Sequence, residues 1–379
     1  MSTSSSGDLV IDPAEFARRV IQPADFVPDT EAFVDVRLPR SAGKASYSFI
    51  GPGVSQNDAQ TVNLTEPHGF QIGAASMDHG VINNQHLHFT AEVLICTRGR
   101  WRVNIGEHTE QQLEIGPGTV FSAPTWVFRG FENIGADNGW LFTVLGGDDT
   151  GGIIWAPDVL RAAAKTGLYL RSDYSLLDST NGDLPNDVVR PLDAELLTAV
   201  DTYSDEELAA RTVAMDGLRW SNKALLSSVI AEHGAALAPV IGYGLTEDRH
   251  HRAPIATPHG FSVEWLRVGP GADTGIHRHQ RNQVVLVCEG RWEIAVNRGD
   301  DTLGATPAEG SVVSIPPGAW RNLKNIGSSD ALALVVCETD ERAAIEWDPE
   351  IVASAETIGW GHDASGYLAP LALLGRPPQ

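Results

Sequence analysis

One segment of this chain is present twice. Each copy contains a glycine, a His-x-His pair, an acidic or amide residue and a second glycine at the same spacing. The copies are Gly80, His86, His88, Glu92 and Gly99, and, shifted by 191 residues, Gly271, His277, His279, Gln283 and Gly290. On a β-strand, residues separated by one lie on the same side, so each His-x-His pair converges. Two converging imidazoles form half of a metal site.

The duplication extends well beyond the histidines. Pro67–Phe70 matches Pro258–Phe261, and Asn133–Gly135 matches Asn325–Gly327 with the offset increased to 192. We therefore expect two copies of one structural unit joined by a substantial connector. The expected segments are an N-terminal helical arm (1–45), a first barrel (46–170), a partly helical connector (171–236), a second barrel (237–357) and a C-terminal tail (358–379).

Each copy is a series of short apolar segments separated by glycine-rich turns, which is typical of a β-sandwich or β-barrel. The strands expected in the first copy are Phe70–Met77, Leu87–Cys96, Arg100–Ile105, Val120–Ser122 and Leu141–Leu145. Helices are expected at their borders, because helix-start signals occur there. These are Asp12-Pro13, the segment Pro157–Thr166, and Ser204 with Glu207.

Composition excludes several classes of partner. The net charge is −22 and the pI is about 4.8, which argues against nucleic acid and anionic membranes. The three cysteines show no tight spacing, so neither a disulfide framework nor a zinc knuckle is expected. The N-terminus shows no signal-peptide pattern, and no apolar run reaches membrane-spanning length. We expect a cytoplasmic protein that forms a homodimer or higher homo-oligomer.

The duplicated pattern resembles the first conserved motif of the cupin superfamily. A second cupin motif follows in each copy, as Gly118, Pro124, Trp126, Arg129 and Asn133, and as Gly310, Pro316, Gly318, Arg321 and Asn325. The resemblance implies a mainly β bicupin, with two tandem jelly-roll (double-stranded β-helix) barrels and flanking and connecting helices. Within bicupins, Pro124–Phe128 is similar to the second motif of gentisate-type ring-cleaving dioxygenases.

The first copy keeps three of the four ligands used by metal-binding cupins. The resemblance implies His86, His88 and Glu92 as ligands, and all three share one parity if they lie on one strand. The fourth ligand, a histidine, is replaced by Arg129, which has no lone pair to donate but can bind an anion bidentately. Two histidines and a carboxylate are the set used by non-haem Fe(II) oxygenases.

The second copy offers His277, His279 and Gln283 beside Arg321. It contains no anionic ligand, so a cation next to Arg321 is electrostatically unfavourable. A metal and an anionic ligand both remain open for this site.

The leading hypothesis is a non-haem Fe(II) dioxygenase acting on a small aromatic or enolisable carboxylate. Arg129 would orient the substrate anion, and Trp126 is a candidate for stacking on it. Mn(II), Ni(II) or Zn(II) could replace iron. Two alternatives remain: an isomerase or lyase that uses the metal as a Lewis acid, and a metal-independent or degenerate bicupin that binds small anions. In the metal-free reading, Glu92 and Arg129 form a buried ion pair.

Several other conserved pairs of the duplication are expected to be structural. His68 and His259 precede each His-x-His by 18 residues, and we expect hydrogen bonds rather than metal ligation. The strand after His68 is expected to run antiparallel to that of His86. Trp101 and Trp292 are expected in the cores.

Overall fold

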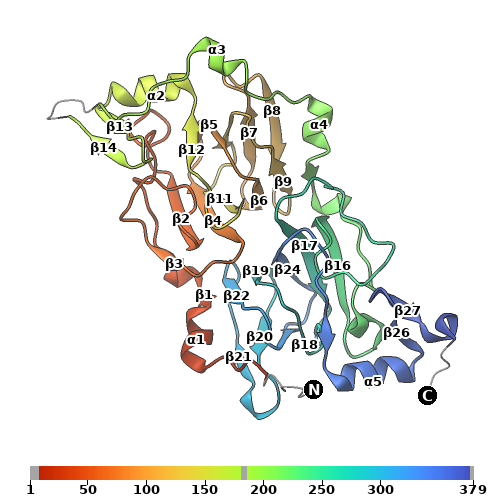
Figure 1. Ribbon diagram of the computed structural model, residues 1–379. Coiled ribbons are helices and arrows are strands. Elements are labelled where there is room, and N and C mark those ends of the chain that lie inside the picture. The colour runs from red at the N-terminus through yellow and green to blue at the C-terminus, as the bar shows by residue number, and fades with distance from the viewer. Residues whose placement is uncertain (1–7, 181–185, 376–379) are drawn as a thin grey trace, which may run out of the picture. The chain divides into compact units, whose positions relative to one another are not determined.

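The computed structural model describes residues 8–180 and 186–375 (Figure 1). The chain divides into two compact units: residues 26–217 form one, and the residues before 26 pack with those from 218 onward. The arm expected over 1–45 is therefore shared between the units, with its break at Asp25 and Phe26. The other expected boundaries stay predictions.

The first unit contains two mainly antiparallel sheets, which confirms the mainly β prediction. The larger sheet has the order β15-β9-β6-β11-β4-β2-β3 and the smaller β12-β5-β10-β7-β8. The larger sheet consists of β2 (Ala45–Ile50), β3 (Val62–Leu64), β4 (Phe70–Met77), β6 (Glu92–Arg98), β9 (Val120–Ala123), β11 (Gly139–Gly146) and β15 (Thr212–Val213). The smaller consists of β5 (Ile82–His88), β7 (Trp101–Ile105), β8 (Gln111–Ile115), β10 (Arg129–Asn133) and β12 (Ile153–Trp155).

The second unit repeats this arrangement. Its larger sheet has the order β1-β22-β19-β24-β17-β16 and its smaller sheet β21-β20-β23-β18-β25. The larger sheet consists of β1 (Val20–Ile21), β16 (Ala235–Ile241), β17 (Phe261–Val268), β19 (Gln283–Glu289), β22 (Val312–Ile315) and β24 (Ala331–Glu338). The smaller consists of β18 (His277–Arg278), β20 (Trp292–Val296), β21 (Leu303–Ala305), β23 (Arg321–Asn325) and β25 (Glu346–Trp347).

Two separate two-stranded ribbons accompany the barrels. One pairs β13 (Leu168–Leu170) with β14 (Leu176–Asp178), and the other pairs β26 (Trp360–His362) with β27 (Leu368–Pro370).

Short helices flank and connect the barrels, as expected. They are α1 (Pro13–Arg18), α2 (Pro157–Ala164), α3 (Ala194–Leu197), α4 (Asp205–Ala209) and α5 (Pro349–Thr357), with single 3₁₀ turns at Pro23–Asp25, Met215–Gly217, Leu226–Val229, Gly299–Asp301 and Leu371–Leu374. Asp12 caps α1 by accepting from the Glu15 amide at 2.9 Å, and Ser204 and Glu207 form the expected capping box of α4. In the described part of the chain, no helix combines enough length and apolar character to cross a membrane.

The N-terminal arm supplies the edge strand of the second unit's larger sheet. Strand β1 pairs with β22, with Val20 opposite Val313 (Figure 1). The amide of Ile11 donates to the side chain of Asn297 at 2.8 Å, and that side chain donates back to the Ile11 carbonyl. Residues 11–21 are therefore part of the second barrel's structure.

The expected structural residues are confirmed, although one pairing differs. Trp101 and Trp292 are fully buried, and their indole nitrogens donate to backbone carbonyls at 3.0 Å. The His68 and His259 rings each contact a backbone carbonyl two residues earlier at 2.6 Å. However, the strand after His68, β4, does not pair with β5: the two belong to different sheets.

Candidate metal centre

His86 and His88 lie at the end of β5 and face the interior of the first barrel. The strand is held between β10 and β12, with His86 opposite both Arg129 and Trp155. Strand alternation places both rings on one side, and their centroids are 5.0 Å apart. Both residues are buried.

Glu92 reaches the histidines from another sheet. The expectation that His86, His88 and Glu92 share one strand is wrong: β5 ends at His88, residues 89–91 turn, and Glu92 begins β6. The turn nevertheless brings one ligand atom of each residue within 4.8 Å of the others. Among the described residues, this is the one group of His, Cys, Asp and Glu side chains close enough to hold a metal.

The histidine nitrogens are prepared for ligation. Nδ1 of His86 lies 2.7 Å from the Asn84 carbonyl, which can only accept, so the proton lies on Nδ1 and Nε2 keeps its lone pair. Both ring nitrogens of His88 are buried without a partner. Burial, and then the charge of Arg129, lower the pKa of His86 to about 3 and that of His88 well below its usual value. Both rings are therefore neutral at physiological pH, as metal ligands must be.

Arg129 pairs with Glu92. The guanidinium is fully buried, and its Nε and Nη2 lie 3.0 and 2.9 Å from the same carboxylate oxygen, Oε2. Burial lowers the pKa of Arg129, and the Glu92 charge acts in the opposite direction. This ion pair is the one anticipated by the metal-free alternative, but both contacts use Oε2 and leave Oε1 outside the pair.

A small cavity opens from the three residues. Its volume is about 70 Å³, and its wall includes His86, His88, Glu92 and the lysine Lys44. Since one water needs roughly 10 to 15 Å³ of cavity volume, the space holds about five to seven non-hydrogen atoms of a small molecule. Arg129 is not among the residues that line the cavity. Its role as a substrate anchor therefore stays a prediction.

Trp126 lies away from this cavity. Its side chain is 46% exposed, packs against Phe89 with ring centroids 5.3 Å apart, and is not part of the cavity wall. Its φ of 56° is unusual for a bulky residue. Its stacking on a substrate stays a prediction.

Sequence reasoning missed Lys44 and its neighbours. Lys44 is almost fully buried and forms an ion pair with Asp35, which is completely buried. The residue belongs to the segment expected to be an arm, and the matching position of the second copy is Ala235. The duplication, which guided the choice of candidates, therefore gave no signal for it.

In the second barrel, Arg321 occupies the space between the candidate ligands. Its Nη1 donates to the Gln283 side-chain oxygen at 2.6 Å and lies 3.0 Å from Nε2 of His279. Its other nitrogens donate to the carbonyls of Ala319 and Pro316. Burial lowers the pKa of Arg321 to about 9.

The remaining histidine of this site keeps the same orientation as in the first barrel. Nδ1 of His277 lies 2.8 Å from the Gly275 carbonyl, and its Nε2 is buried without a partner. Burial, and then the charge of Arg321, lower the pKa of His277 to about 4. His279, by contrast, already has its Nε2 in contact with Arg321 and Gln283.

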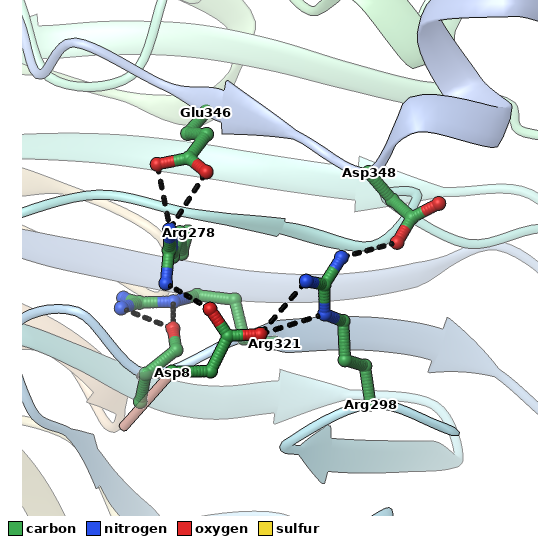
Figure 2. Close-up of polar contacts among 7 residues, drawn as sticks. Asp8, Arg278, Arg298, Arg321, Glu346 and Asp348 are labelled. Atoms are coloured by element: carbon green, nitrogen blue, oxygen red, sulfur yellow. Dashed lines mark hydrogen bonds and ion pairs between the residues drawn. The ribbon is translucent and has the colours of Figure 1, made fainter. Parts of the chain in front are cut away.

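The N-terminal arm closes over Arg321 from outside. Leu9 pairs with Ala319, whose carbonyl accepts from Arg321. Figure 2 shows that the adjacent Asp8 bridges Arg278 and Arg298, which also pair with Glu346 and Asp348. The arginine of this site therefore donates to groups of the chain itself, while Nε2 of His277 has no partner.

Comparison with known proteins agrees with this architecture. The cupin domain family matches residues 264–337. Oxalate decarboxylase from Bacillus subtilis at pH 4.6 matches in structure with a TM-score of 0.54 and 14% identity, over 88% of this chain and 79% of that one. The fold is that of a bicupin.

Other structures of the same enzyme are similar to this chain to the same degree. A deletion mutant matches with a TM-score of 0.55 and 14% identity, over 93% of this chain and 83% of that one. A structure from a study of the Mn(II) centres of that enzyme matches with a TM-score of 0.54 and 14% identity, over 93% of this chain and 83% of that one. Among curated proteins, none matches this chain in sequence.

The residues of the first barrel fit a divalent cation. Each of the three residues offers a suitable donor. His88 has two buried ring nitrogens without hydrogen-bond partners, and His86 keeps the lone pair of its Nε2. Glu92 has one carboxylate oxygen outside its ion pair with Arg129. Among the described residues, no carboxylate joins the histidines of the second barrel closely enough to hold a metal, and a guanidinium lies among the donors, so the site fits a cation poorly.

Proposed function

We propose that this bicupin is a lyase that binds one divalent metal in the first barrel and removes CO₂ from a small carboxylic acid. The observation that carries the proposal is the His86, His88 and Glu92 set at the end of a small cavity that also contains a lysine. The fold likeness to a decarboxylase supports it. Mn(II) is the first metal to test, because the similar enzyme has Mn(II) centres.

The size of the cavity favours a small acid. A volume of about 70 Å³ holds about five to seven non-hydrogen atoms, whereas an aromatic hydroxy acid has about ten or more. The aromatic substrate considered from sequence therefore fits less well than a short aliphatic acid. Iron and dioxygenase chemistry remain the competing proposal, because two histidines and one carboxylate also suit Fe(II).

The chain's own residues provide the setting for the reaction. A bound metal would supply a Lewis acid that polarises the substrate carboxylate. His86 and His88 hold neutral nitrogens in place, and Arg129 fixes Glu92 through Oε2. Apolar side chains, among them Phe33, Phe131 and Ile153, form part of the cavity wall and reduce the area that water can contact there.

The overall reaction is R–COO⁻ + H⁺ → R–H + CO₂. The bond between the substrate carbon and its carboxyl carbon breaks. The electron pair stays on the substrate carbon, which then takes up a proton. No net oxidation occurs, and this distinguishes the proposal from a dioxygenase.

The test measures CO₂ and O₂ together. Protein loaded with Mn(II), or separately with Fe(II), is incubated with two- to four-carbon mono- and dicarboxylates and with an aromatic hydroxy acid. We expect CO₂ release from a short acid without stoichiometric O₂ uptake, and none from Glu92→Gln. Equal uptake of O₂ per substrate, or turnover of the aromatic acid alone, would support the dioxygenase instead. Absence of bound metal would overturn both.

A further inference from the structure

Lys44 lies in the wall of the cavity that contains the candidate metal ligands. Among the described lining residues it is the one lysine or arginine. Its side chain is 4% exposed. The mechanism outlined above assigns it no role, and Arg129, the cation considered first from sequence, does not line the cavity.

The ammonium group is held firmly but retains donor capacity. It donates to a carboxylate oxygen of Asp35 and to the side-chain oxygen of Asn83, the latter at 2.7 Å. An ammonium has three N–H groups, so one remains for a ligand. The rings of Phe33 and Trp155 lie 5.0 and 5.7 Å from the nitrogen, and both favour a cation there.

A hydrogen-bond network links this lysine to the metal ligand His86. Asp35 accepts from the Asn84 side-chain nitrogen at 2.9 Å and from its amide at 3.3 Å. The carbonyl of Asn84 in turn contacts Nδ1 of His86 at 2.7 Å. Asp35, which holds the ammonium of Lys44, is therefore hydrogen-bonded to Asn84, the residue that orients the ring of His86.

We propose that Lys44 binds a carboxylate of the substrate and so restricts the site to short anionic acids with a second acidic group. The inference rests on the proposed function, in which the metal engages the carboxyl group that is lost. A strongly acidic protein, with a net charge of −22, repels anions at long range, so a local cation is needed to retain one. Burial lowers the pKa of Lys44, but the Asp35 charge acts in the opposite direction and favours the ammonium.

The second barrel has no equivalent of this arrangement. Ala235 stands at the position matching Lys44. The strand register supports this match, because the next residues pair equivalently: Ala45 lies opposite Ser76 in the first barrel, and Ala236 lies opposite Arg267 in the second. Both pairs are related by the offset of 191 residues. A carboxylate site built on Lys44 therefore belongs to the first barrel alone.

The test compares an acid with its neutral analogue. Binding of malonate and of malonamide to the Mn(II)-loaded full chain is measured by calorimetry for wild type, Lys44→Met, Asp35→Asn and the double variant Lys44→Met/Asp35→Asn. Lys165→Met is the control, since it removes an exposed lysine of the same unit. We expect Lys44→Met to weaken malonate binding about tenfold to a hundredfold, the effect of one lost charged hydrogen bond. Malonamide binding and metal content should stay unchanged.

The other variants separate binding from folding. Asp35→Asn removes the charge that favours the ammonium but keeps the amine, so it should weaken malonate binding less than Lys44→Met does. The double variant, with no charge left unpaired, should fold and show the full loss of malonate binding. If Lys44 only anchors Asp35, all three variants lower the melting temperature and leave malonate affinity per folded molecule unchanged, and the inference is overturned.

Failure of the proposed function has a different signature. A wild-type protein that releases no CO₂ but still prefers malonate to malonamide through Lys44 would refute the reaction and keep the binding site. Normal turnover with an unchanged KM in Lys44→Met would refute the binding site and keep the reaction.

Discussion

The two barrels differ at the residue that faces the arginine. In the first, Glu92 neutralises Arg129, and the histidine nitrogens of His88 stay without partners. In the second, Gln283 carries no charge, and Arg321 contacts both it and His279. The change between a carboxylate and an amide thus accompanies a second difference: in the second barrel the arginine contacts Nε2 of His279, whereas Nε2 of His277 has no partner.

The two barrels also differ at a position of the cavity wall. Gly73 lines the cavity of the first barrel, and the matching residue of the second is Glu264. The Glu264 carboxyl is buried and accepts a backbone hydrogen bond from Leu245 at 3.0 Å. Burial raises its pKa to about 8, so it is largely protonated at neutral pH and adds no strong anionic ligand. The first barrel therefore combines a possible metal-binding group with a cavity, whereas in the second a buried carboxyl replaces the glycine of the cavity wall.

The largest effect should appear in metal content. We expect about one divalent ion per chain in protein purified without chelator. Glu92→Gln should reduce this to nearly zero, since the carboxylate is the anionic ligand, whereas Gln283→Ala should leave it unchanged. Elemental analysis of the three proteins checks the ratio. Two ions in the wild type, or full retention in Glu92→Gln, would show that the contrast between the barrels is wrong.

Substitution of Arg129 and substitution of Arg321 should lower stability by amounts that respond differently to added metal. Arg129→Met leaves Glu92 as an unpaired buried charge, which costs about 3–5 kcal/mol of stability, and added Mn(II) should restore much of it. Arg321→Met removes a donor whose hydrogen-bond acceptors are all uncharged. It should lower stability by about 1–3 kcal/mol whether or not metal is present. Urea unfolding with and without Mn(II) measures both. Equal responses to metal would contradict the assignment of Arg129 as a partner of a metal ligand.

The most gradual effect concerns Glu264, because it is spread over about 3.5 pH units. Its pKa is about 8 in the folded protein and 4.5 as a free side chain, so the folded state holds the extra proton between these values. Stability from this residue is complete below pH 4.5 and is lost as the pH rises toward 8, at about 1.4 kcal/mol per pH unit. Glu264→Gln should therefore stabilise the protein more at pH 8 than at pH 5. Melting temperatures at the two pH values test this, and an identical shift at both would exclude a raised pKa.

The fold and the metal donors could be predicted because duplication preserved their spacing. The spacing of each His-x-His pair predicted two imidazoles on one side of a strand, and the replacement of a histidine by Arg129 was visible in the sequence. The break between His88 and Glu92 was not, because the turn Phe89-Thr90-Ala91 contains neither glycine nor proline. Lys44 was missed because its role depends on Asp35 and Asn83, contacts that only the folded chain brings together.

The pairing of β1 with β22 has a consequence for synthesis of the chain. Ile21 lies opposite Val312, so this edge strand must wait for its neighbour until almost the whole protein has been made. At about 5–20 residues per second, the delay is roughly 15 to 60 seconds. Residues 26–217 can fold during that interval, while a short apolar strand stays unpaired at the N-terminus. Chaperone binding to a nascent chain would therefore be expected at its oldest end rather than at its newest.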